Sequence, residues 1–330
     1  MARQSYLLIA AASLALGACG GGGGGAGVNS TPPPPPPPSP PPPPPPTSAV
    51  TIFPSPSPAE YATVGASISG PGGNLDEYPG GNSQFGDVST ADADQAHIRY
   101  TSGGYYEIKM QSADWDRLVP YKGLVNPPAD NNYFQPQSVA MNFGYLVTRN
   151  SRLDGYSYSE LGSWGSDAAA RWGYVAFGDA SPAGGVPITG LATFAGVVAG
   201  SADIMSPDYL YGGYYPAGIG GTVTLNFDFG KGTFGGAMDL LLDDGMQPLE
   251  LGTFGFTQTV FSSGSTTYSG KFNATAAGDN FFLGQFTGPN GEETIGAWAM
   301  PFVFDVSGST LTADHQTHQA FGAWIAKKSN

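Results

Sequence analysis

Few side chains in this 330-residue sequence have the chemistry of a catalytic or metal-binding centre. The histidines are His97, His315 and His318, and Cys19 is the single cysteine. His315 and His318 have a spacing that lets two imidazoles on one turn reach a metal ion or ligate haem iron. A solvated loop between two strands is the favoured interpretation. We therefore expect no resident metal or cofactor, and we name His315 and His318 as the residues that would bind haem as a ligand.

Paired carboxylates occur at Asp243-Asp244 and Glu292-Glu293. Neighbouring residues of a strand point to opposite faces, whereas a glycosidase dyad needs two carboxylates that face one cleft. The sequence contains no Gly-x-Ser-x-Gly nucleophile motif, no phosphate-binding P-loop and no Gly-x-Gly-x-x-Gly segment that opens a helix. These observations indicate a protein that is not an enzyme.

An aromatic segment offers contact surface in place of catalysis. Tyr209, Tyr211, Tyr214 and Tyr215 stand among glycines and a proline, which predicts a loop between two strands. Tyrosine in an exposed loop supplies a large, rigid contact area with a polar tip. We interpret the four tyrosines as a candidate ligand-binding loop. The alternative is that they fold back over the open end of a barrel.

The N-terminus gives the single cysteine a role. A short segment with Arg3 precedes an apolar run that is too short to cross a membrane as a helix, which takes about 20 residues. Leu16-Gly17-Ala18-Cys19 resembles the bacterial lipobox, whose cysteine is diacylated before cleavage in front of it. We expect residues 1–18 to be a lipoprotein signal peptide and Cys19 to carry the lipid. Gly20, where Asp would signal retention, implies an outer-membrane location.

Residues 19–49 have the composition of a disordered tether. Gly20–Gly25 is a flexible run, and Pro32–Pro46 is interrupted only by Ser39. Neither run has apolar side chains to bury. The prolines favour a polyproline II rod of about 3.1 Å per residue, or roughly 45 Å in all. Such a rod would hold the following region clear of the lipid headgroups; a ligand for a proline-recognition domain is the alternative.

Composition predicts an acidic, all-β remainder. The 26 acidic residues exceed the 12 basic ones, giving a net charge of −14, and no Lys/Arg cluster is present, which argues against nucleic-acid binding. Only 12% of residues are charged, and 50 are glycine. Such a sequence suits sheets with tight turns better than amphipathic helices.

Hydrophobic alternation predicts strands joined by hairpins. In Thr222–Phe229 every second residue is apolar, so one face should line a core and the other should meet solvent. Gly230-Lys231-Gly232 predicts a hairpin turn. Further strands are expected at His97–Thr101, Tyr105–Met110, Arg117–Tyr121, Val139–Arg149, Gly155–Trp164, Arg171–Phe177, Gly190–Ser201, Thr233–Leu242, Glu250–Phe261, Thr266–Ala276, Phe281–Thr287 and Thr294–Val306. Repeated hairpins favour an up-and-down antiparallel barrel, which has no exposed edges.

The segment Tyr268–Ala274 and the following Phe281–Trp298 carry a recognisable pattern. The residues that carry it are Gly284, Phe286, Gly288, Pro289, Glu292 and Gly296. This pattern resembles the closing barrel motif of transferrin-binding protein B and its relatives, and Pro187–Gly196 resembles their opening strand. The resemblance implies a surface lipoprotein with an eight-stranded barrel after a handle domain, and a partner such as a host iron protein, haem or a complement regulator. We expect the motif itself to maintain the barrel.

The sequence thus predicts four parts: the signal peptide 1–18, the tether 19–49, an irregular β-rich handle-like region 50–137, and a barrel 138–330. Known members with two lobes are longer, so the resemblance does not specify transferrin. We expect a surface-exposed outer-membrane lipoprotein whose barrel loops capture a host iron protein, haem or another nutrient, with a TonB-dependent receptor as a further partner. The alternatives are a structural envelope lipoprotein and, less favoured, an anchored envelope hydrolase.

Overall fold

The computed structural model describes residues 52–53, 56–69, 86–110, 114–121, 131–138, 144–166, 171–207, 214–243, 247–308 and 311–329. The signal peptide, Cys19 and the tether lie outside these residues. The helices within them are two 3₁₀ turns, η2 (Asp92–Asp94) and η3 (Ser151–Asp154). In this part of the chain no helix is both long and apolar enough to cross a membrane.

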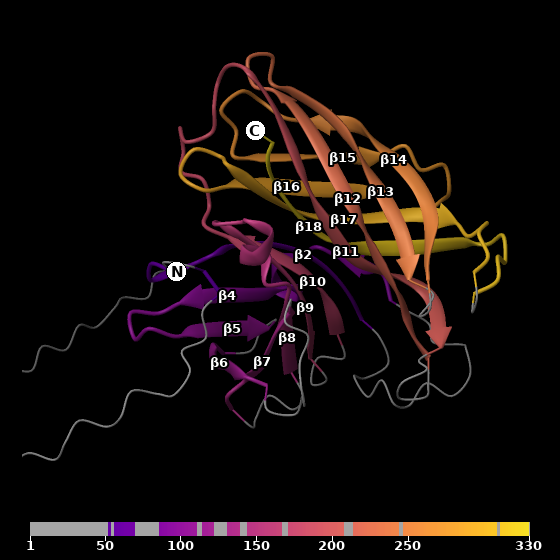
Figure 1. Cartoon of the computed structure of the whole chain (residues 1–330), viewed down its shortest axis with the longest axis horizontal. Helices are drawn as coiled ribbons and strands as arrows, with labels where there is room; N and C mark the ends of the chain where they lie inside the picture. The colour runs from indigo at the N-terminus through magenta and orange to yellow at the C-terminus, as the bar shows by residue number, and fades with distance from the viewer. Residues whose placement is uncertain are drawn as a thin grey trace, which may run out of the picture. The chain divides into compact units, whose positions relative to one another are not determined.

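Strands of the compact unit 48–330 form two sheets (Figure 1). The first has ten strands in the order β1-β4-β5-β6-β7-β8-β9-β10-β2-β3. Its strands are β1 (Ala59–Glu60), β2 (Ala62–Ser69), β3 (Val88–Ser89), β4 (Ala96–Tyr100), β5 (Tyr106–Met110), β6 (Asp116–Pro120), β7 (Asn132–Pro136), β8 (Gly144–Thr148), β9 (Ser159–Ser166) and β10 (Arg171–Gly178). We call this sheet the handle sheet.

The second sheet is a closed barrel of eight strands in sequence order. Its strands are β11 (Leu191–Pro207), β12 (Tyr214–Asp228), β13 (Thr233–Asp243), β14 (Pro248–Val260), β15 (Thr267–Phe272), β16 (Phe281–Thr287), β17 (Glu293–Val303) and β18 (Thr317–Lys328). All neighbours pair antiparallel, and β18 closes on β11. The predicted all-β fold with an eight-stranded up-and-down barrel after a smaller β-rich region is confirmed.

The barrel interior is a packed aromatic core. Val223, Leu225 and Phe227 of β12 are buried, while Thr224 and Asn226 between them are exposed, as the alternation predicts. The rings around Phe227 are close enough for direct packing: its centroid lies 4.9 Å from those of Phe234 and Phe286, and 5.2 Å from that of Tyr268.

The boundary expected at residue 138 is wrong, because β8, β9 and β10 belong to the handle sheet and not to the barrel. β10 pairs with β9 on one side and with β2 on the other. β2 precedes β10 by about one hundred residues of sequence, as Ala62 opposite Gly178 illustrates. Alternation identifies a strand but not the sheet that it joins. The barrel therefore begins at Leu191.

β17 and β18 differ from the other barrel strands because both of their faces are buried. Trp298 and Trp324 point into the barrel core. The opposite faces carry Ala297, Ala299, Ala323, Ile295, Ile325 and Phe321, which pack on Val64, Ala66, Ile68, Tyr156, Leu161 and Ala176 from the handle-sheet side. The small alanines let the two sheets approach closely. Burial on both faces removes alternation, and β18 was accordingly not predicted as a full strand.

Candidate functional site

The rim of the barrel is the end at which β11 finishes at Pro207 and β12 starts at Tyr214. Tyr209 and Tyr211 lie outside the described residues. The backbones of Tyr214 and Tyr215 belong to β12, where they pair with Pro207 and Ser206 of β11. The sequence had predicted a loop for these two tyrosines, but both are strand residues. The paired part of the β11–β12 hairpin therefore continues further than the Gly/Pro pattern indicates.

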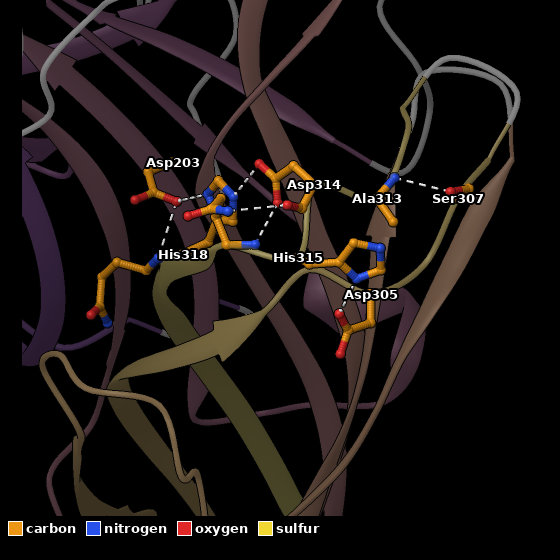
Figure 2. Close-up of polar contacts among 9 residues, drawn as sticks. Asp203, Asp305, Ser307, Ala313, Asp314, His315 and His318 are labelled. Carbon is orange, nitrogen blue, oxygen red and sulfur yellow. Dashed lines mark hydrogen bonds and ion pairs between the residues drawn. The ribbon is translucent and has the colours of Figure 1, made fainter.

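His318 lies at the same rim, in strand β18 and not in a loop (Figure 2). Its Nδ1 lies 2.9 Å from Oδ1 of Asp203, and its Nε2 lies 3.0 Å from Oδ2 of Asp314. The hydrogen bond to Asp203, together with that to Asp314, raises the pKa of His318 against the opposing effect of partial desolvation. Desolvation acts to raise the pKa of Asp314, but hydrogen bonds from the Gln316 amide and His318 lower it in net.

His315 makes a separate contact. Its Nδ1 lies 2.7 Å from Oδ1 of Asp305, its side chain is exposed, and its backbone has φ 58°, in the left-handed region. Both ring nitrogens of His318 are held by carboxylates, so ligation of haem iron by this pair would first require one of those contacts to break. Within the described residues, no group of three or more His, Cys, Asp or Glu side chains is arranged to hold a metal ion.

The rim contacts join segments that are distant in sequence. Asp203 of β11 also accepts a hydrogen bond from the Gln319 amide at 3.0 Å. The Gln319 side chain in turn donates to the Asp279 carbonyl at 2.9 Å and accepts from the Asp279 amide at 3.0 Å. We call these residues, with Asp305, Asp314, His315 and His318, the rim network. It connects β11, β18, the β15–β16 connection and the β17–β18 connection.

Charge is distributed unevenly along the barrel. Carboxylates gather toward the rim at Asp203, Asp243, Asp279, Asp305 and Asp314. Residues 191–330 contain no arginine, and their lysines are Lys231, Lys271, Lys327 and Lys328. Of these, Lys231, Lys327 and Lys328 stand at the end opposite the rim, where β12 turns into β13 and β18 finishes. A rim of this sign attracts a cationic partner surface.

The recognised closing motif lies at the end opposite the rim. Phe286 is fully buried in the barrel core. Gly284 lies under the ring of Tyr268 and Gly296 under the ring of Trp324, so that an added Cβ at either glycine would overlap the ring. Gly288 has φ 83°, which favours glycine.

The two glutamates of this motif have different partners. Glu292 accepts hydrogen bonds from the Asn290 amide at 2.8 Å and from its side chain, inside the exposed turn after Pro289. Glu293 is 4% exposed and accepts from the amides of Ser157 at 2.7 Å and Tyr158 at 3.1 Å, just before β9 of the handle sheet. Desolvation raises the pKa of Glu293, against the effect of these hydrogen bonds.

Further contacts surround Glu293. Ser159 and Thr287 share a hydrogen bond of 2.7 Å, the Ser181 hydroxyl donates to the Gly288 carbonyl at 2.7 Å, and the Gly288 amide donates to the Asp179 carbonyl at 2.8 Å. We call this set of contacts the clasp. It joins the closing hairpin of the barrel to residues 157–159 and 179–181. Sequence analysis missed the clasp, because nothing in the motif shows that Glu293 reaches another sheet.

Glu160 is a second buried carboxyl that sequence analysis missed. It is 1% exposed, and its oxygens accept hydrogen bonds from the Ser151 hydroxyl at 2.6 Å and the Leu161 amide at 3.1 Å. Desolvation, only partly offset by these bonds, raises the pKa of Glu160 to about 8. A carboxyl that is protonated near neutral pH can act as a general acid. The described partners of Glu160 are the Ser151 hydroxyl and the Leu161 amide, which give it a structural role.

The outer wall of the barrel carries a shallow groove of about 470 Å³ between Tyr174 and the β12–β13 surface. Its lining includes Gly200, Gly218 and Gly220, together with Leu241 and Asp243. Small-molecule sites usually combine apolar walls with several convergent polar groups. Here three of the lining residues are glycines, and the polar side chains of the lining are those of Tyr174 and Asp243, so the groove offers few groups to orient a small ligand.

Among known proteins, the similar ones are found by comparison with solved structures. No protein-family model matches the chain, and no curated protein matches it. The chain is similar to transferrin-binding protein B. The structure of that protein from Haemophilus parasuis Hp5, a double mutant, is 13% identical over 81% of this chain and 44% of its own, with a TM-score of 0.42.

Two other solved structures are similar at the same level. Transferrin-binding protein B from serogroup B Neisseria meningitidis is 13% identical over 81% of this chain and 43% of its own, with a TM-score of 0.40. The haemoglobin receptor HpuA from Kingella denitrificans is 12% identical over 82% of this chain and 87% of its own, with a TM-score of 0.35. This chain therefore spans less than half of either transferrin-binding protein B.

Proposed function

We propose that this chain is a lipid-anchored outer-membrane surface protein that captures a host iron-carrying protein through the rim of its barrel. The observation that carries the proposal is the packed aromatic barrel interior combined with an acidic rim. A barrel filled by its own side chains presents its binding surface outside, on the rim and the wall. The lipobox and tether of the sequence supply the anchor, and the sequence motif resembles that of receptors for iron-carrying proteins.

A protein partner suits this surface better than a small ligand. Protein interfaces use exposed aromatic and polar side chains over about 800 Å² per partner, and the rim offers polar networks and acidic charge. Haem is less well served, since both imidazole nitrogens of His318 are held by Asp203 and Asp314. A TonB-dependent receptor would then take up the iron.

Binding of the immobilised full chain to purified iron-carrying serum proteins, including transferrin and haemoglobin, tests the proposal. Replacing Asp305 and Asp314 together by Asn should slow association at least tenfold at low salt, because steering depends on charge. The matched control is Asp228→Asn at the opposite end of the barrel, which should leave association unchanged. Binding to none of these proteins, or equal effects of the rim and control variants, would refute capture through the rim.

Anchoring and haem binding are tested separately. Cys19→Ser should release the protein from the membrane, and unchanged membrane association would refute lipidation at Cys19. A haem titration followed by absorbance should show no shift that depends on the histidines. A Soret shift that is lost in a His315→Ala/His318→Ala double variant would establish haem as the ligand in place of a protein.

A further inference from the structure

Strand pairing in the barrel is uneven at one junction. β14 has 13 residues, whereas its neighbour β15 has six. β15 pairs with β14 at Phe256, Thr257 and Val260. The first half of β14, from Leu249 to Phe254, therefore has β13 on one side, and no described strand pairs with it on the other (strand positions in Figure 1). A regular strand of six residues would be roughly 20 Å long at about 3.3 Å per residue. This edge is somewhat shorter, because the register with β13 shifts at Leu251, as in a β-bulge.

The contacts of Asn273 show which backbone groups face the open side. The Asn273 amide donates to the Gly255 carbonyl at 2.9 Å, and the Gly255 amide donates to Oδ1 of Asn273 at 2.9 Å. Both backbone groups of Gly255 thus face β15. Backbone groups alternate along a strand, so those of Thr253, two residues earlier, face the same side. Thr253 is exposed, and within the described strands it pairs with Asp239 of β13 and with no residue of β15.

The edge has a definite chemistry. Asp239, Asp243 and Glu250 are exposed on β13 and β14, and neither strand contains Lys or Arg. Leu249 and Leu251 are half-buried against the barrel core, so each leaves apolar surface uncovered beside the edge. Acidic charge at an edge opposes pairing with a second copy of the same edge. The same charge attracts a strand of opposite sign.

We propose that the open edge of β14, from Leu249 to Phe254, is a binding site for an extended peptide segment of a partner protein in which apolar and basic residues alternate. The segment adds to the barrel wall as an extra strand: its backbone bonds to Thr253, its apolar side chains cover Leu249 and Leu251, and its basic side chains approach Glu250. Addition of a strand to an exposed edge is an established mode of peptide recognition. This surface does not depend on which protein binds the rim.

A ten-residue peptide of alternating lysine and valine, labelled with a fluorophore, is the probe, and anisotropy with the full chain is the measurement. Two peptide comparisons identify the mode of binding. A peptide with glutamate in place of lysine should bind at least tenfold more weakly. A lysine–valine peptide N-methylated at alternate residues keeps its charge but lacks the backbone donors of one edge, and it should also lose at least tenfold. If the methylated and unmethylated peptides bound equally well, charge alone would account for the affinity and the proposal would be overturned. Failure of the unmethylated peptide to bind would overturn it as well.

The protein side has its own matched pair. Thr253→Pro removes the outward amide, whereas Thr253→Ala removes the same side chain and keeps that amide. The proline variant should bind the peptide at least tenfold more weakly than the alanine variant, and equal affinities would overturn the proposal.

Hydrogen exchange measured on the unaltered chain tests the open edge without any variant, so its result stands even if Thr253→Pro fails to fold. The Thr253 amide should exchange at least tenfold faster than the Phe254 amide, which faces β13, and should slow on addition of the peptide. Protection of Thr253 in the free chain would show that another segment or a second copy already covers the edge, and the proposal would fail.

Discussion

Removal of the Glu293 carboxylate tests whether the clasp holds the barrel and the handle sheet together. Glu293→Ala deletes the acceptor for the amides of Ser157 and Tyr158, which lie 2.7 and 3.1 Å from its oxygens. Glu292→Ala is the matched control, because its carboxylate has the same chemistry but bonds to Asn290 within the exposed turn. The two substitutions affect neighbouring residues. Glu293→Ala removes hydrogen bonds to the segment before β9, whereas Glu292→Ala removes hydrogen bonds within its own turn.

The expected loss follows from the geometry. Hydrogen bonds to a charged group contribute about 1.5–3 kcal/mol each, so two give about 3–6 kcal/mol. Two effects reduce this value. Ser157 is exposed, so water can replace its lost acceptor, and the desolvation that raises the pKa of Glu293 is relieved when the carboxylate is removed. We expect a net loss of about 2 kcal/mol for Glu293→Ala and about 0.5 kcal/mol for Glu292→Ala.

Thermal unfolding at pH 7 measures both variants. A loss of about 2 kcal/mol in a unit of this size lowers the Tm by roughly 3–4 °C. Hydrogen exchange should rise at the Ser157 and Tyr158 amides in Glu293→Ala and stay unchanged in Glu292→Ala. Equal destabilisation by the two substitutions, or a loss of less than about 0.5 kcal/mol for Glu293→Ala, would refute the clasp as a stabilising contact.

Three further predictions concern single side chains. The pKa of Glu160, raised to about 8, means that the fold loses stability as pH rises from the ordinary value of 4.5 toward 8, by about 1.4 kcal/mol per unit at most; Glu160→Gln should flatten this slope in denaturant titrations, and an unchanged slope would contradict it. His318 has a raised pKa, so its contribution to the free energy of unfolding is complete below the unfolded pKa of about 6.5 and is lost as pH rises through the folded value. His318→Ala should therefore cost about 1 kcal/mol at pH 5.5 and little at pH 9, whereas substitution of the exposed His315 by Ala should cost little at either pH. Gly284→Ala should cost about 1–3 kcal/mol because the new methyl meets an aromatic ring, whereas Gly220→Ala, with nothing within 4 Å of its Cβ position, should be nearly neutral in the same melts.

The barrel strands were predictable wherever one face meets water. β12 shows this: Val223 and Phe227 alternate with exposed threonine and asparagine, and the hairpin turn at Lys231 follows as its glycines indicate. The closing motif in Phe281–Trp298 was also recognisable from the sequence alone. Each of these signals is local, because residues two apart in one strand share one environment.

Contacts between the two sheets were not predictable. Ala323 and Ile325 of β18 are buried by the handle sheet, which gives that strand no polar face and no alternating pattern. Glu160 and Glu293 are buried carboxyls, and acidic residues are rarely buried unless they have partners. Their partners come from a different turn or a different sheet, and no spacing in the sequence announces such contacts. The boundary at residue 138 was wrong for the same reason.

The rim contacts were anticipated only in part. His315 and His318 were selected for their spacing, yet the structure gives each a different carboxylate, Asp305 for one and Asp203 with Asp314 for the other. Asp203 lies more than one hundred residues from His318 in sequence. The pairing depends on β11 and β18 closing the barrel side by side, which a local pattern of histidines cannot indicate.

The same geometry explains why the sequence resemblance specifies a fold and leaves the ligand open. The closing hairpin is constrained from both sides: Phe286 and Trp298 fill the barrel core, while Glu293 and Ala297 contact the handle-sheet side. Few residue types satisfy two packed environments at once, so a segment of this kind keeps a recognisable pattern. The rim and the open edge of β14 pack on one side at most and are free to carry charge suited to a partner. Binding specificity in this chain should therefore be sought in Asp203, Asp314 and Glu250, outside the motif by which its fold is recognised.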